Sequence, residues 1–268
     1  MSPFLARSET FEQVGSTNDV VRGWLAAGTP EVCLAVAREQ TAGRGRDGRS
    51  WVAPAGGALL LSLGFRPTWL EPDAAWRLAA VASLAMADAA EASAGLDAGT
   101  IRLKWPNDLV IVEADGLRKL AGVLGETDGL GSPDPRVVVG LGINTDWAIA
   151  DFPADLDGSM TSLHEASGRP IDNDELLAAF IGRLESAIAS LKAGRFAAAA
   201  WSGRQLTTGR WVHLSFPDGS SSDLPAVGVD TRSGALLVVD PAIPDVRRHV
   251  FVGEIEHVRL VGPIAGAV

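Results

Sequence analysis

The sequence predicts an α+β fold in which a mixed β-sheet packs against helices, with a small β-barrel at its C-terminal end. Residues 57–65 alternate large apolar with other residues, which is typical of a strand, and residues 172–194 carry the apolar stripe of a helix. From about Gly209 the pattern changes to short, evenly spaced strands and turns, which favours a barrel. We therefore expect two domains, residues 1–206 and residues 207–268.

The composition is that of an ordinary globular protein, with 268 residues of which 47% are hydrophobic and 21% charged. The formal net charge of -10 argues against nucleic acid as a partner, because phosphate-backbone binding usually requires a basic surface. The single cysteine, Cys33, lies in an apolar run, which predicts a buried, inert thiol and no intrachain disulfide. No signal peptide pattern and no segment as long as a membrane span is present, so we expect a cytoplasmic protein without membrane contact.

The first elements lead into a loop that is rich in arginine and glycine. A helix capped by Ser16 or Thr17 is predicted to end at Gly28, and a strand follows it. The loop runs from Gln40 to Trp51 and holds three arginines and three glycines in twelve residues. Glycine lets the backbone approach a ligand, and arginine presents N–H donors that fit carboxylate or phosphate. An anion site is one interpretation and a solvated turn the other; Trp51, which can stack on a base, favours the anion site.

The remaining elements follow from apolar periodicity and from turn residues. Trp105-Pro106 interrupts a strand, because proline cannot donate to a β-ladder, and Asp115-Gly116 predicts a hairpin turn. Asp172 and Glu175 have the spacing of a capping box. Strands are expected at residues 31–38, 57–65, 101–112 with that interruption, 119–126 and 137–144, and helices at residues 72–95, 172–194 and 196–201.

Lysine is rare in this chain. Of its 23 basic residues only Lys104, Lys119 and Lys192 are lysines, and two of them fall in one short segment. A lysine kept where arginine serves elsewhere indicates a site that needs a compact ammonium ion, although chance placement of three residues gives the same pattern. Lys104 and Lys119 are therefore candidate site residues.

Taken together, these segments resemble the biotin protein ligases, also called biotin–acetyl-CoA-carboxylase ligases. The matching motifs, in the family's order, are Ser16-Thr17-Asn18, residues 40–51, 104–108, 119–124 and 140–144, Gly253-Glu254 and Val258-Arg259. The resemblance implies a class II synthetase-like ligase domain followed by an SH3-like domain. Some members carry a winged helix-turn-helix domain before the Ser-Thr-Asn motif. Since only fifteen residues precede Ser16, we expect the monofunctional type, which binds no DNA.

The resemblance implies a two-step reaction that uses ATP and Mg²⁺, with biotin as substrate. The carboxylate of biotin attacks the α-phosphate of ATP and gives biotinyl-5′-AMP and pyrophosphate. A lysine of a biotin carboxyl carrier protein or domain, part of a biotin-dependent carboxylase, then displaces AMP. Both steps bring negative charges together, so cations and backbone donors have to be preorganised around them. The sequence leaves the choice between monomer and homodimer open.

On the matching positions, the resemblance assigns residues to each substrate. The residues assigned to biotin are Ser16, Thr17, Asn18, Gln40, Gly43, Arg44, Lys119 and Gly122. The residues assigned to the nucleotide are Arg46, Arg49, Trp51, Lys104, Asn107 and Asn144. The resemblance implies that Arg44 acts through its backbone, that Arg49 closes the loop and that Trp51 lies beside the adenine.

Three of the matching positions are expected to be catalytic. The resemblance implies that Lys119 bridges the biotin carboxylate and the α-phosphate, and that Arg46 neutralises phosphate and carboxylate. Asp108 orients either Mg²⁺ or the incoming lysine amine, and the sequence does not choose between the two. We also expect residues 43–48 to be mobile without ligand and to order over the adenylate, because a glycine-rich, charged backbone is costly to order alone.

Two alternatives are considered. Lipoate and octanoate ligases share the fold and the acyl-transfer logic, but they carry a paired-arginine, glycine-triplet and histidine pattern where this chain has Gly43-Arg44-Gly45-Arg46. No histidine lies near the loop in this sequence. A non-catalytic biotin-binding regulator is the other alternative, and the presence of both Lys104 and Lys119 argues against it.

Overall fold

The structure is a computed structural model, which describes residues 4–113, 116–153, 156, 158–255 and 257–263. The chain divides into two compact units. The first consists of Met1–Ile101 and Leu109–Phe196, and the second of Arg102–Asp108 and Ala197–Val268. The hairpin turn that the sequence predicts at Asp115-Gly116 lies partly outside the described residues, since residue 115 is not among them.

The first unit is built on a mixed sheet, in which its strands lie in the order β1-β2-β3-β7-β6-β5. Strand β1 pairs in parallel with β2, whereas the β2–β3, β3–β7 and β6–β7 pairs are antiparallel. Every residue of β3 is buried, so both faces of the sheet are covered there. The strands are β1 (Arg7–Val14), β2 (Cys33–Gln40), β3 (Ala58–Phe65), β5 (Asp108–Glu113), β6 (Gly116–Asp128) and β7 (Arg136–Asn144). The predicted mixed sheet is therefore confirmed.

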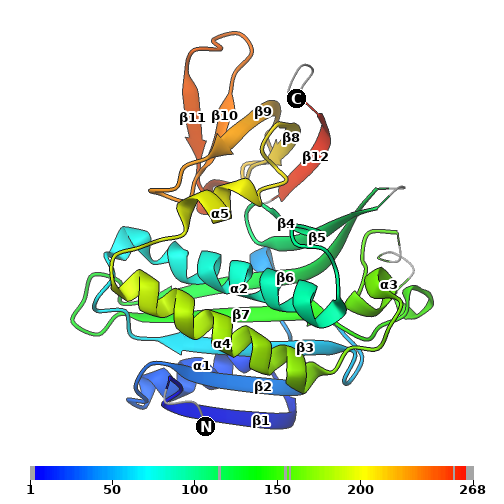
Figure 1. Cartoon of the computed structure of the whole chain (residues 1–268). Coiled ribbons are helices and arrows are strands. Elements are labelled where there is room, and N and C mark those ends of the chain that lie inside the picture. Colours follow the sequence, from blue (N-terminus) through cyan, green and yellow to red (C-terminus); the bar gives the residue numbers. More distant parts are fainter. Residues whose placement is uncertain (1–3, 114–115, 154–155, 157, 256, 264–268) are drawn as a thin grey trace. The chain divides into compact units, whose positions relative to one another are not determined.

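Helices cover the sheet, with α2 and α4 in front of the strands and α1 behind them in Figure 1. Helix α1 packs on β2, β3 and β7, and helix α2 packs on α4, β6 and β7. The helices of this unit are α1 (Thr17–Ala26), α2 (Trp76–Ala94), α3 (Leu163–Ser167) and α4 (Asn173–Lys192). Short 3-10 turns are η1 (Arg46–Gly48), η2 (Pro72–Ala74) and η3 (Ile149–Asp151).

The start of α4 and the end of α2 follow the capping rules that the sequence suggested, whereas the cap predicted for α1 does not form. The Asp172 carboxylate accepts hydrogen bonds from the backbone N–H groups of Asp174 and Glu175 and so starts α4. Helix α2 ends at Gly95, whose φ of 64° is in the left-handed region that glycine tolerates. Ser16 occupies the position before α1, although its side chain makes no capping hydrogen bond.

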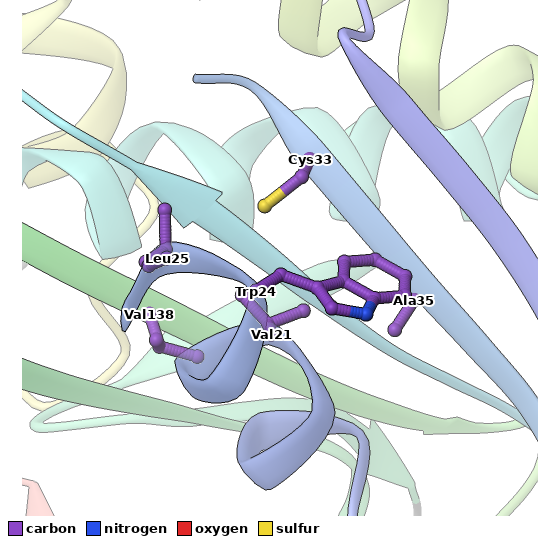
Figure 2. Close-up of a cluster of buried hydrophobic side chains, with 6 residues drawn as sticks. All are labelled: Val21, Trp24, Leu25, Cys33, Ala35 and Val138. Carbon is purple, nitrogen blue, oxygen red and sulfur yellow. The ribbon is translucent and has the colours of Figure 1, made fainter. Parts of the chain in front are cut away.

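An apolar cluster joins α1 to the sheet (Figure 2). Its members are Val21, Trp24 and Leu25 of α1, Cys33 and Ala35 of β2, and Val138 of β7. Burial raises the pKa of the Cys33 thiol to about 11, so the thiol stays protonated, as the sequence predicts for an inert cysteine. Gly64 lies against this cluster, and a Cβ there would be 2.6 Å from the Cys33 sulfur, so the packing of α1 requires glycine.

The second unit contains an antiparallel sheet of five short strands in the order β11-β10-β9-β8-β12. The predicted change to short strands after Gly209 is confirmed. Its elements are α5 (Ala198–Gly203), β8 (Arg210–Ser215), β9 (Ser221–Val229), β10 (Leu236–Val239), β11 (Arg247–Val250), η4 (Val252–Glu254) and β12 (His257–Pro263). Most of strand β4 (Ile101–Lys104) also belongs to this unit. None of the described helices has the length and apolar character that crossing a bilayer requires.

Candidate active site

The arginine loop leaves the sheet at Gln40, the last residue of β2. Backbone hydrogen bonds fix both ends of the loop: Thr41 donates to Val14 at 2.9 Å, and Trp51 donates to Gly43 at 2.9 Å. Between them the chain reverses direction, because Arg44 and Ser50 form an antiparallel bridge, and Asp47 within this reversal has a φ of 57°. A Cβ on Gly43 would lie 2.5 Å from the Trp51 carbonyl oxygen, so the two sides of the loop touch at a position that requires glycine.

Three buried polar side chains, Thr17, Asn18 and Ser62, lie with the half-buried Gln40 where α1, β2 and β3 meet, and we name these four residues the head-group cluster. The Gln40 Oε1 atom accepts hydrogen bonds from the backbone N–H of Thr17 at 2.7 Å and from its hydroxyl at 2.9 Å. The Ser62 hydroxyl lies 2.7 Å from Thr17 Oγ1 and 2.5 Å from Asn18 Oδ1, within donating distance of both. These bonds set the orientation of the Gln40 amide, whose Nε2 faces the loop at Gly43.

Two paired glycines make a flat floor beside the loop. Gly122 on β6 pairs with Gly142 on β7, and the indole of Trp51 lies over both. A Cβ on Gly142 would be 2.7 Å from Trp51 Cε2, and a Cβ on Gly122 would be 3.1 Å from Trp51 Cζ3. The Lys119 Nζ atom lies 5.5 Å from the centroid of the Trp51 ring, so one ammonium group is held at the floor.

The three arginines of the loop have different environments. Arg44 forms a bidentate ion pair with Asp19, with both nitrogen–oxygen distances at 2.7 Å. Its guanidinium holds the pKa of the Asp19 carboxyl below the usual range, chiefly through this hydrogen bonding. The Arg46 side chain is only 12% exposed, whereas that of Arg49 is 53% exposed and donates through Nε to the Arg46 carbonyl at 3.1 Å. Arg46 is therefore the most enclosed of the three.

A second buried polar group lies at the end of β7, and we name Asn144, Thr145 and Thr161 the β7-end cluster. Asn144 donates through Nδ2 to the Thr161 carbonyl at 2.9 Å. Among the described residues, the buried atoms Asn144 Oδ1, Thr145 Oγ1 and Thr161 Oγ1 have no hydrogen-bond partner. Thr161 also donates its backbone N–H to the Lys119 carbonyl at 2.9 Å, which ties the cluster to the strand that carries this lysine.

An aromatic cluster accompanies the β7-end cluster. Trp147 and Phe152 pack with their ring centroids 4.2 Å apart, and Met160 completes the buried set. Ala53, which follows the arginine loop in sequence, packs against the same group. Sequence reasoning overlooked these residues and the two threonines, although the polar and aromatic run Asn-Thr-Asp-Trp after a buried strand was a usable signal. It also overlooked Ser62, a lone hydroxyl in an otherwise apolar strand.

The segment that contains Lys104, Asn107 and Asp108 belongs to the second unit. Within that unit, Lys104 Nζ lies 3.4 Å from Asp108 Oδ2, and both side chains are less than one fifth exposed. The neighbouring Trp105 is buried, with its backbone N–H donating to Thr207 Oγ1 and its indole Nε1 to the Gly234 carbonyl, both at 2.9 Å. The described residues contain no group of three or more His, Cys, Asp or Glu side chains that could hold a metal ion. Mg²⁺ is commonly held by one or two carboxylates together with substrate phosphates, so Asp108 fits that role as a single ligand.

The family model and the curated relatives that match this chain point to the same family. Residues 10–144 match the model of the biotin/lipoate A/B protein ligase family. Over 249 residues the chain is 32% identical to a biotin–[acetyl-CoA-carboxylase] ligase of Mycobacterium tuberculosis, covering 92% of this chain and 87% of the relative. It is 39% identical over 155 residues to the bifunctional ligase/repressor BirA of Escherichia coli, covering 57% of this chain and 44% of that protein. The match thus spans less than half of the bifunctional relative.

Solved structures agree with the sequence relatives. A biotin protein ligase from Aquifex aeolicus in complex with biotin and ATP superposes with a TM-score of 0.77 and 26% identity, covering 95% of this chain and 99% of that one. The predicted α+β architecture is the architecture of that structure. The chain therefore belongs to the biotin/lipoate A/B protein ligase family, among the biotin protein ligases.

Proposed function

We propose that the chain uses ATP to convert biotin to biotinyl-5′-AMP and then transfers the biotinyl group to a specific lysine of a biotin carboxyl carrier protein or domain. One observation carries the proposal. The Gln40 amide faces Gly43, Gly43 touches Trp51, and Trp51 lies over the glycine floor beside Lys119. This continuous set of contacts offers oriented polar groups at one end and the Lys119 ammonium group at the other, which suits a ligand with an uncharged polar ring and a carboxylate.

The head-group cluster suits the ureido ring of biotin. A cyclic urea presents two N–H donors and one carbonyl acceptor, and it carries no charge. Oriented hydroxyl and amide groups can match it without a charged partner, because hydrogen bonds between buried neutral groups fix orientation. We assign Ser16, Thr17, Asn18 and Gln40 to this ring. Gly43, the Arg44 backbone and Gly122 are further biotin contacts in this assignment.

In the first step, a carboxylate oxygen of biotin forms a bond to the α-phosphorus of ATP while the bond to the pyrophosphate oxygen breaks. Two anions have to approach each other, so preorganised cations lower the barrier. Lys119 and Arg46 supply that charge in our assignment. Arg49, Trp51, Asn144, Lys104 and Asn107 are assigned to the nucleotide, and Mg²⁺ bound by its phosphates would neutralise further charge.

In the second step, the neutral ε-amine of the carrier lysine forms a bond to the acyl carbon of the adenylate. The bond from that carbon to the phosphate oxygen breaks, AMP leaves, and the new amide nitrogen releases a proton. Lys119, placed beside the mixed anhydride, would stabilise the charge on the departing phosphate. Asp108 is the candidate for orienting the amine or for holding Mg²⁺.

The direct test is transfer of biotin to a carrier domain in the presence of ATP and Mg²⁺. Mass spectrometry should show one added biotinyl group on the carrier, and none when ATP is left out or when the carrier's acceptor lysine is changed to arginine. Transfer of lipoate or octanoate in place of biotin would support the lipoate-type alternative. Biotin binding without biotin-dependent AMP formation would support a non-catalytic regulator. Either result would overturn the proposal.

Three further assignments are part of the proposal. Residues 1–206 act as the catalytic domain and residues 207–268 as the SH3-like domain, the enzyme acts in the cytoplasm, and it can form a homodimer. Limited proteolysis, cell fractionation and light scattering test these in turn.

A further inference from the structure

Charged groups join the start of the arginine loop to helix α1 and strand β6. The Arg44 guanidinium donates to both carboxylate oxygens of Asp19, each at 2.7 Å. Its Nη2 atom also lies 3.6 Å from Glu126 Oε1. The side chain of the loop's first arginine is therefore directed to α1 and β6 by two carboxylates from different elements.

The same two carboxylates share a second arginine. Arg22 donates to Asp19 Oδ1 at 2.6 Å and to Glu126 Oε2 at 2.6 Å. The Asn18 amide also donates to Glu126 Oε2, at 2.8 Å. We name Asp19, Arg22, Arg44 and Glu126 the loop network. It is closed, because each carboxylate contacts both arginines.

The loop network is bonded to Asn18 of α1, a side chain that has little room to move. Asn18 is 4% exposed, and a Cβ on Gly140 would lie 2.2 Å from its Oδ1 atom. Asn18 is also a member of the head-group cluster, through Ser62. The buried Asn18 side chain thus joins the loop network to the head-group cluster. The carboxylates that hold Arg44 are therefore fixed to the same part of the protein that orients Gln40.

The loop network also affects which arginine of the arginine loop is available to bind a ligand. A bidentate pair with a carboxylate uses the planar fork that would otherwise bind a phosphate or the biotin carboxylate. An isolated, half-exposed ion pair contributes little, but a bidentate pair within a network is the favourable case. The Arg44 guanidinium is therefore paired with Asp19 at the start of the loop. The Arg44 backbone stays next to Gly43, where an added Cβ would lie 3.2 Å from Gln40 Nε2.

We propose that Asp19, assisted by Glu126, is a positioning residue that fixes the start of the arginine loop through the Arg44 side chain, so that the loop backbone is in place before biotin binds. This proposal replaces the mobility of residues 43–48 that the glycine and charge content of the loop led us to expect, because the contacts of Arg44 were not visible in the sequence. The kinetic part of this inference rests on the proposed function. The structural part, that Asp19 orders residues 43–51 in the free protein, does not.

The test uses the full chain with Asp19→Asn, which keeps the size of the side chain and removes its charge. In ligand-free protein, hydrogen exchange of the amides of Gly45, Arg49 and Trp51 should become about fivefold faster, because their hydrogen bonds lie inside the loop. In the reaction, the KM for biotin should rise about fivefold while kcat changes less than about twofold. The reason is that the free energy needed to order the loop would then weaken biotin binding and would not affect the chemical step.

Two companion variants separate positioning from a general loss of charge. Asp19→Glu keeps the carboxylate and should recover most of both losses. Glu9→Gln removes a carboxylate of similar exposure, 45% against 48%, that pairs with Arg7 at 3.0 Å on β1. It should leave loop exchange and the KM for biotin at wild-type values.

Unchanged loop exchange in the Asp19→Asn variant overturns the inference, whether or not the chain uses biotin. Faster exchange with an unchanged KM overturns it as well. A lower KM also overturns it, because Asp19 would then be withholding Arg44 from the ligand. Absence of biotin-dependent AMP formation in the wild-type chain refutes the proposed function alone, and the exchange result still decides whether Asp19 orders the loop.

Discussion

The two polar ends of the candidate site differ in how completely the protein satisfies them. In the head-group cluster, Thr17, Gln40 and Ser62 form a chain of hydrogen bonds between side chains. In the β7-end cluster, Asn144 Oδ1, Thr145 Oγ1 and Thr161 Oγ1 are buried and find no partner in the part of the chain that the structure describes. A buried polar atom without a partner costs about 1–3 kcal/mol, so such atoms indicate where a ligand is expected. From this difference we propose that the first end is preformed and that a bound ligand completes the second.

The largest expected effect is at Lys119, whose ammonium group lies over the Trp51 ring and whose carbonyl accepts the Thr161 N–H. Lys119→Ala should lower the rate of biotin-dependent pyrophosphate exchange about a hundredfold to a thousandfold, because it removes a preorganised cation from the reacting groups. Biotin binding, measured by calorimetry, should remain detectable, since the head-group cluster does not include Lys119. Full pyrophosphate exchange in this variant would show that the cation is not needed.

The next effect concerns the preformed end. Ser62→Ala should raise the KM for biotin about tenfold and leave the KM for ATP unchanged, because Thr17 and Asn18 lose the hydroxyl that holds them. Ser83→Ala is the matched control, since that buried hydroxyl donates to the Ala79 carbonyl within its own helix. An equal effect of the two substitutions on the KM for biotin would remove the special role of the cluster.

The smallest effect concerns the end that we expect a ligand to complete. Thr161→Val replaces the unpartnered hydroxyl with a methyl group of similar size. The melting temperature of the free protein should stay the same or rise, whereas the KM for ATP should increase about threefold. Ser62→Ala should instead lower the melting temperature. A clear drop in the melting temperature of Thr161→Val would indicate that its hydroxyl is already bonded within the protein.

The features of the fold that the sequence could predict depend on residues that are close together along the chain. The apolar period of residues 172–194 and the cap at Asp172 require only neighbours along one helix, and the structure confirms both. The break at Trp105-Pro106 between β4 and β5 follows from proline chemistry alone. The change to short strands after Gly209 likewise reflects turn residues that lie close together in the chain.

The parts that sequence could not predict depend on pairs that are distant along the chain. Ser62 matters because α1 packs on β3 and brings Thr17 to it, 45 residues away. Glu126 meets Asn18 only after β6 has joined the sheet, 108 residues further on. The composition of the arginine loop favours an anion site, which stays a prediction. That Asp19 pairs with the first arginine of the loop is visible only in the folded chain.

The most direct test of the comparison is a crystal structure of the chain with biotinyl-5′-AMP, set beside a crystal structure of the free protein. We predict that the hydrogen bonds from Thr17 to Gln40 are the same in both structures. We also predict that at least one of Asn144 Oδ1, Thr145 Oγ1 and Thr161 Oγ1 bonds the nucleotide in the complex. A head-group cluster that forms only in the complex, or a complex in which none of these three oxygens contacts the nucleotide, would contradict the account.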